Sequence, residues 1–159
     1  MKKKLLKHFV SIAAAIYVAG LLTVCSMAYI YYSGGHDTAY LEINNTALSI
    51  TMGFVYLRAC SAWQNTSTPA VVTTNNNQTD HIIQSGYYDE DWYGLYSPSG
   101  YLSNGRATKF EISFNMIGTS TDNNYRQSVI VHEIGHALCL DDNPSYKVGP
   151  INDSIMNYD

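Results

Sequence analysis

Cysteine is scarce in this chain. Three of the 159 residues are cysteine, Cys25, Cys60 and Cys139, and none stands at metal-ligand spacing from another, which excludes a zinc site built from cysteines. In an oxidising compartment Cys60 and Cys139 could form one disulfide, and two buried thiols are an equally good interpretation. A fold held together by several disulfides is therefore not expected.

Basic residues are few as well, and they are unevenly placed. Of the nine Lys and Arg residues, four are Lys2, Lys3, Lys4 and Lys7. Without that basic start, five Lys and Arg residues remain against all thirteen Asp and Glu residues, a net charge of −8. So acidic a chain is a poor binder of nucleic acid or of an anionic membrane surface. The sequence leaves the oligomeric state open.

Long apolar runs are absent except at the beginning. Residues 9–24 are uncharged and mostly apolar, and Ser26-Met27-Ala28 places small residues at a cleavage position. With the lysines in front, residues 1–28 have the parts of a secretory signal peptide in their usual order. We expect one secreted domain over residues 29–159, because this length suits a single core. The alternative is an uncleaved anchor that holds the domain to the membrane on its extracytoplasmic side.

The periodicity of apolar residues favours an α+β fold. Residues 47–63 carry Ala47, Ile50, Phe54 and Leu57 at helical spacing, after capping side chains at residues 44–46. Ahead of this helix, the paired glycines at residues 34–35 indicate a flexible start. The other expected elements are strands over residues 39–43, 70–74, 81–88, 92–96 and 108–115, loops at residues 75–77, 98–100 and 104–105, and a second helix over residues 125–139.

Two histidines in the second helix are placed to share one metal ion. His132 and His136 are four residues apart, so both imidazoles lie on one face of the helix. The sequence His132-Glu133-x-x-His136 suits Zn²⁺, with Glu133 beside the metal as a general base. The alternative is a chance match on an amphipathic helix. His36 and His81 have no partner at ligand spacing.

A catalytic zinc site needs a third protein ligand beyond this helix. The chain must bend before it can supply one, and Asp142 lies far enough along for that bend. Asp141 competes for the same role. Together with Ser154-Ile155-Met156-Asn157-Tyr158, the stretch resembles the metzincin zinc-protease signature followed by a Met-turn, and its aspartate resembles the snapalysin type.

The resemblance implies a fold and a role for each of these residues. The fold would be zincin-like, a twisted mixed sheet of four to five strands with two main helices and a minimal C-terminal subdomain. His132, His136 and Asp142 would hold zinc, Glu133 would activate water, and Met156 would form the floor beneath the metal. Tyr158 stands where a tyrosine in astacins and serralysins can reach the metal and stabilise an oxyanion, the alternative being a partly buried structural tyrosine.

One position departs from the family. The glycine of the signature, at the bend after the helix, is Cys139 here. Glycine suits that place because it adopts positive φ without strain. Either the bend is made differently in this chain or Cys139 tolerates the strain.

The sequence thus predicts a secreted zinc endopeptidase acting on a protein or peptide. We expect the substrate to add as a strand along an antiparallel edge, for which residues 92–97 are the best candidate. The alternatives are a zinc-containing binding domain without activity and a hydrolase of a non-peptide amide. Asp89-Glu90-Asp91 offers oxygen ligands for Ca²⁺, although an acidic surface turn is the simpler account of it.

Overall fold

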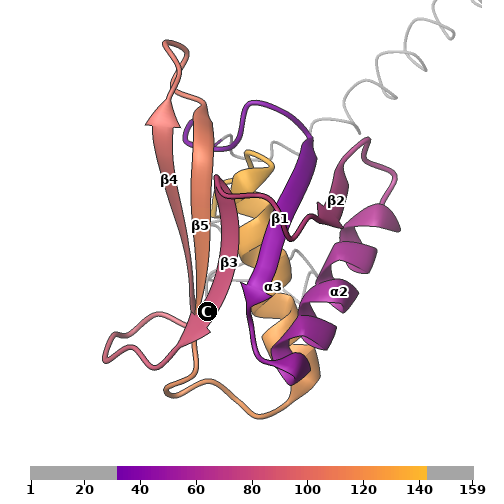
Figure 1. Ribbon diagram of the computed structural model, residues 1–159, viewed down its shortest axis with the longest axis vertical. Helices are drawn as coiled ribbons and strands as arrows, with labels where there is room; N and C mark the ends of the chain where they lie inside the picture. Colours follow the sequence, from indigo (N-terminus) through magenta and orange to yellow (C-terminus); the bar gives the residue numbers. More distant parts are fainter. Residues whose placement is uncertain (1–31, 143–159) are drawn as a thin grey trace, which may run out of the picture.

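The computed structural model describes residues 32–142. Within them the chain forms an α+β fold in which a mixed sheet of five strands packs against two helices (Figure 1). The expected signal peptide at residues 1–28 and the stretch with Met156 and Tyr158 lie outside the described residues. Within the part described, no helix is both long and apolar enough to cross a membrane.

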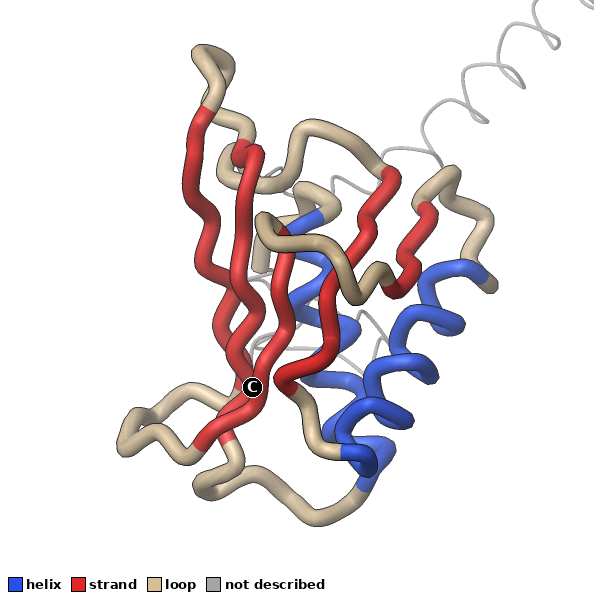
Figure 2. The backbone as a smooth tube through the Cα atoms, viewed as in Figure 1, coloured by secondary structure: helices blue, strands red, loops and turns tan. Residues whose placement is uncertain are grey.

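The sheet has the order β2-β1-β3-β5-β4. Its first four members run parallel to their neighbours, and β4 runs antiparallel to β5 at the edge. Figure 2 shows the strands as one twisted layer beside the two helices. The bounds are β1 Tyr40–Ala47, β2 Val71–Thr74, β3 His81–Gly86, β4 Gly94–Tyr101 and β5 Ala107–Asn115.

The alternation expected in β5 is confirmed. Phe110, Ile112 and Phe114 are buried, whereas Lys109 is exposed. The strand therefore turns these three side chains to the helices, as the period of two requires. Its other face is only partly open to solvent, because Glu111 is half-buried and Ser113 is buried beside Gln84 of β3. The remaining core residues come from the other four strands and both helices: Leu41, Ile43, Met52, Val55, Tyr56, Ala59, Cys60, Trp63, Val72, Ile83, Tyr96, Ile130, Val131, Ile134 and Ala137.

Helix α2, Ile50–Gln64, forms where the sequence indicated but buries a different face. Its N-cap is Ser49, whose hydroxyl accepts from the Met52 N–H, while the expected caps at residues 44–46 belong to β1. The face with Ile50, Phe54 and Leu57 was the wrong choice for the core: these side chains are 84%, 66% and 48% exposed. The face that meets the core carries Met52, Val55, Tyr56, Ala59, Cys60 and Trp63.

The misassignment has a physical reason. Apolar residues lie on both sides of α2, so periodicity alone fits two faces, and the partners decide between them. The indole N–H of Trp63 donates to the carbonyl of Val131 in the second helix at 3.1 Å, and the phenol of Tyr56 donates to Thr73 in β2 at 3.3 Å. Buried donors of this kind need acceptors, and only this rotation of the helix supplies both.

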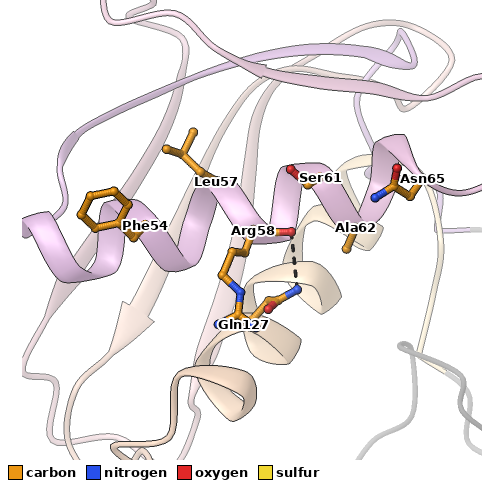
Figure 3. Close-up of a pocket in the computed structure, with 7 residues that line it drawn as sticks. All are labelled: Phe54, Leu57, Arg58, Ser61, Ala62, Asn65 and Gln127. Atoms are coloured by element: carbon orange, nitrogen blue, oxygen red, sulfur yellow. Dashed lines mark hydrogen bonds between the residues drawn. The ribbon is translucent and has the colours of Figure 1, made fainter.

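The exposed side of α2 borders a hollow of about 470 Å³. Figure 3 shows its lining residues along α2, with Gln127 of the second helix donating to the main chain of Arg58 at 3.4 Å. This hollow lies on the far side of α2 from the core residues and contains none of the residues of the His-Glu-x-x-His motif.

Two further expectations about local structure are wrong. Pro98, Ser99 and Gly100 lie inside β4 rather than in a loop, because an edge strand tolerates proline where its missing N–H faces away from the sheet. The segment around Gly34 and Gly35 is anchored rather than a loose start. The Gly35 carbonyl accepts from Ala107 N–H at 3.0 Å, and His36 N–H donates to Ala137 at 2.8 Å.

The second helix, α3 at Asn123–Ala137, ends in a Schellman motif. Leu140 N–H donates to the Gly135 carbonyl at 2.9 Å, and Cys139 N–H donates to His136 at 3.0 Å. Cys139 has φ = 71°. Of the two alternatives for this position, Cys139 therefore itself occupies the left-handed conformation at the bend, which glycine would adopt without strain.

Because Cys139 has positive φ, we expect glycine at this position to give a more stable protein than alanine. Cys139→Gly and Cys139→Ala both remove the thiol, and only the second keeps a Cβ at positive φ. We expect the glycine variant to unfold with a free energy about 1 kcal/mol higher than the alanine variant. Chemical denaturation of the two variants checks it, and alanine proving the more stable would contradict it.

Cys60 and Cys139 form no disulfide, so of the two interpretations the pair of thiols holds. Cys60 is buried in α2, and Cys139 is partly exposed beside Arg106. Burial raises the pKa of the Cys60 thiol to about 11 and, against the opposing charge of Arg106, also raises that of Cys139. Both therefore stay protonated at neutral pH.

Candidate metal centre

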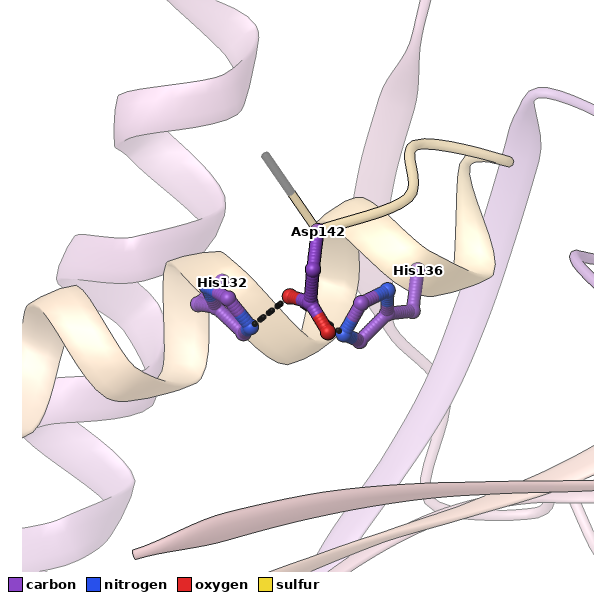
Figure 4. Close-up of side chains that lie close together, drawn as sticks. All are labelled: His132, His136 and Asp142. Atoms are coloured by element: carbon purple, nitrogen blue, oxygen red, sulfur yellow. Dashed lines mark ion pairs between the residues drawn. The ribbon is translucent and has the colours of Figure 1, made fainter. Parts of the chain in front are cut away.

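The structure brings His132, His136 and Asp142 together. One nitrogen from each imidazole and one oxygen of the carboxylate all lie within 4.8 Å of one another (Figure 4). In the part of the chain that is described, no other group of three or more His, Cys, Asp or Glu residues is so arranged. The acidic turn Asp89-Glu90-Asp91 is thus not such a group, and Ca²⁺ binding there stays a prediction.

The distances fit a tetrahedral ion. Oδ1 of Asp142 is 3.1 Å from Nε2 of His132 and 3.6 Å from Nε2 of His136. Ligands about 2.0–2.1 Å from a zinc ion at tetrahedral angles stand roughly 3.3 Å apart. Both separations from the carboxylate oxygen are therefore close to the value for two ligands of one tetrahedral ion, and the ligand nitrogens of the two imidazoles lie within 4.8 Å of each other.

Two details of hydrogen bonding concern His136 and Asp142. Nδ1 of His136 lies 2.9 Å from the carbonyl of Leu140. Because a carbonyl only accepts, Nδ1 carries a proton, and Nε2 is the nitrogen that could bind a metal. Oδ1 of Asp142 is buried and has no hydrogen-bond partner. A buried carboxylate oxygen facing a nitrogen lone pair is costly unless a cation or proton lies between them.

Asp141 takes a different part. Its Oδ1 accepts from the main-chain N–H of Asp142 at 2.9 Å, a turn interaction typical of aspartate. Of the two candidates for the third ligand, Asp142 is therefore the one whose carboxylate faces the histidines.

Glu133 lies on the adjacent side of α3, against the edge strand. It is 6% exposed. Burial raises its pKa to about 8, a main-chain hydrogen bond from Tyr96 opposes the shift, and the nearby charge of Asp142 adds to it. A Cβ on Gly94 would lie 2.6 Å from Oε1 of Glu133. Glycine at the start of β4 is therefore what lets the strand approach the carboxylate so closely.

Sequence reasoning missed several neighbours of the site. The ring of Tyr32 lies 5.4 Å from that of His136, and the ring of Tyr96 lies 6.2 Å from it. Tyr96 also donates its hydroxyl hydrogen to the carbonyl of Gly34 at 3.2 Å. No local signal marks these residues, because their contacts join parts of the chain that are far apart in sequence.

His36 and His81 are core residues away from the metal centre. Their rings are 4.4 Å apart, and that of His81 stacks on Phe110 at 4.7 Å. The nitrogens of His81 lie 3.1 Å from the carbonyls of Glu42 and Thr108. Burial, and next the proximity of His81, lowers the pKa of His36.

No protein-family model matches this chain, and no curated protein matches it. The interpretation of the site therefore depends on its own geometry and on the two short motifs.

Proposed function

We propose that this chain is a secreted zinc-dependent endopeptidase with a zincin-like, metzincin-type fold. The observation that carries the proposal is the convergence of two imidazole nitrogens on a buried carboxylate oxygen without a donor, at the separations of tetrahedral zinc ligands. Two helices packed on a mixed sheet with an antiparallel edge strand support the same proposal.

Each residue has a definite part in this proposal. His132 and His136 would hold the ion through Nε2, and Asp142 through Oδ1. When bound, zinc supplies a Lewis acid that polarises a carbonyl group and acidifies water. Glu133 takes a proton from the attacking water and delivers it to the leaving amine. During these proton transfers the hydrogen bond from the Tyr96 N–H keeps the Glu133 carboxylate in position.

The substrate would bind along β4. This strand ends the sheet, and the bond from Asn115 N–H to the Tyr93 carbonyl at 2.9 Å fixes which of its groups face β5. By alternation, the main-chain groups of Gly94 and Tyr96 face away from β5, and of these the Tyr96 N–H already donates to the Glu133 carboxylate. An extended peptide adding there would run past Glu133, since both residues are in contact with it.

The test makes two measurements on the same purified samples of wild type and Glu133→Gln. Elemental analysis gives the metal content, and an assay with casein gives the rate of hydrolysis. We expect one zinc per chain in both and hydrolysis only in the wild type, with a loss of about 10³-fold or more in the variant. A wild type that binds zinc without cleaving any of a panel of peptides would overturn the proposal. So would a wild type that binds no metal.

A further inference from the structure

Asn115, the last residue of β5, is completely buried, and its side chain makes five hydrogen bonds to the main chain. Its Oδ1 accepts from the N–H groups of Tyr88, at 3.2 Å, and Ile117, at 2.9 Å. Its Nδ2 donates to the carbonyls of Tyr88, Glu90 and Trp92 at 3.0, 3.2 and 3.0 Å. Two N–H donors at one end and three carbonyls at the other define the orientation of the amide.

The three carbonyls belong to the loop between β3 and β4, residues 87–93. Alternate residues of this loop turn their carbonyls inward to one point, where the –NH₂ group of Asn115 stands. Side chains between them point outward, among them the exposed Asp89 and Asp91. The loop is thus closed around a single donor group, in the manner in which other loops close around a cation.

This loop leads directly to the proposed general base. Asn115 also donates its main-chain N–H to Tyr93, and the next residue is Gly94, whose backbone approaches Glu133 so closely that no Cβ fits. Two residues later, Tyr96 donates to the Glu133 carboxylate. A change of a few tenths of an ångström in the loop would therefore be passed to the strand that holds Glu133.

We propose that Asn115 is a positioning residue for Glu133. Its side-chain amide is the fixed donor around which the β3–β4 loop closes, and the closed loop sets the position of the edge strand β4. This inference deepens the proposed hydrolase function and rests on it. Asn115 touches neither the metal ligands nor the path of a substrate along β4, and acts through the strand.

Replacing the amide by a carboxylate gives a specific test. Asn115→Asp has nearly the same shape, but it removes both donors and turns a negative charge toward three carbonyl oxygens, so the loop should open. Those four groups are the ligands that Ca²⁺ prefers. Added Ca²⁺ should therefore close the loop again in this variant. Asn115→Ala lacks the carboxylate, so Ca²⁺ should not close the loop in that variant.

The experiment compares the zinc-loaded full chain as wild type, Asn115→Asp and Asn115→Ala, each with and without millimolar Ca²⁺. Asn104→Asp is the matched control, since its side chain accepts only from Arg106 N–H in the turn after β4. The readouts are amide hydrogen exchange of β4 and α3, zinc content, and kcat and KM for a peptide. The exchange readout does not require activity.

Without Ca²⁺ we expect β4 in Asn115→Asp to exchange about tenfold faster, with α3 and the zinc content unchanged. We expect kcat to fall by about 10²-fold, because a base displaced by an ångström loses that much. Ca²⁺ should restore both quantities in Asn115→Asp alone, and Asn104→Asp should match the wild type throughout. Any of three results would overturn the inference. These are a loss of exchange protection in α3 equal to that in β4, an unchanged exchange rate in β4, and a defect in Asn115→Asp that Ca²⁺ does not reverse. The expected exchange pattern in a chain that cleaves nothing would instead overturn the proposed function.

Discussion

Asp142→Ala is expected to abolish stoichiometric zinc binding. In the proposed site the carboxylate would supply one of three protein ligands and the only negative charge among them, and its Oδ1 lies 3.1 and 3.6 Å from the two imidazole nitrogens. Losing a group that merely supports a ligand weakens metal affinity by about 10–100-fold. Losing the ligand itself should exceed that range. Competition with a chromogenic chelator measures the affinity directly.

The neighbouring aspartate provides the matched control. Asp141→Ala removes the same charge one residue away and costs only the acceptor for the Asp142 N–H. We expect its zinc affinity to fall by no more than the amount typical of a supporting group. Equal losses in the two variants would show that the total charge matters rather than ligation. A greater loss in Asp141→Ala would assign the third ligand to Asp141.

Glu133→Gln is expected to stabilise the metal-free protein at alkaline pH while removing the proposed activity. The pKa of Glu133 is raised from 4.5 to about 8, first by burial. In that interval the folded state keeps a proton that the unfolded state has released, so the unfolding free energy falls as the pH rises. The stability due to this group is complete below pH 4.5 and is lost by about pH 8.

Glutamine has the same shape and does not ionise, so its variant escapes this loss. With zinc removed by a chelator, we expect the variant to be more stable than wild type by a few kcal/mol at pH 8.5. At pH 4 the two should be nearly equal. Urea denaturation at both pH values makes the comparison, and a difference independent of pH would contradict the assignment of the shift to Glu133.

The sequence specified the parts of the fold that depend on local pattern. The alternation through Phe110, Ile112 and Phe114 identified β5, and the four-residue spacing of His132 and His136 placed both imidazoles on one face of α3. These features follow from the geometry of one strand or one helix. Predicting them requires no knowledge of the segments that pack against that strand or helix.

The parts that failed depend on partners far along the chain. The rotation of α2 is decided by acceptors for Trp63 and Tyr56, which no periodicity reveals. Asn115 follows three buried apolar residues at alternate positions and, from the sequence, is only a polar residue at a strand end. Its role becomes visible when the carbonyls of Tyr88, Glu90 and Trp92 are found around it.

The anchoring of the segment around Gly35 has a consequence for the order of folding. Tyr32 N–H donates to the Cys139 carbonyl at 3.0 Å, and its ring lies 5.4 Å from that of His136, so residues more than a hundred positions apart meet beside the proposed metal ligands. Contacts of such long range have the largest loop-closure cost and form late. A growing or unfolded chain therefore lacks a finished site, and the peptide-cleaving chemistry proposed here arises only when the whole described domain has closed. A cell that exports this chain unfolded would be protected from it without any separate inhibitor.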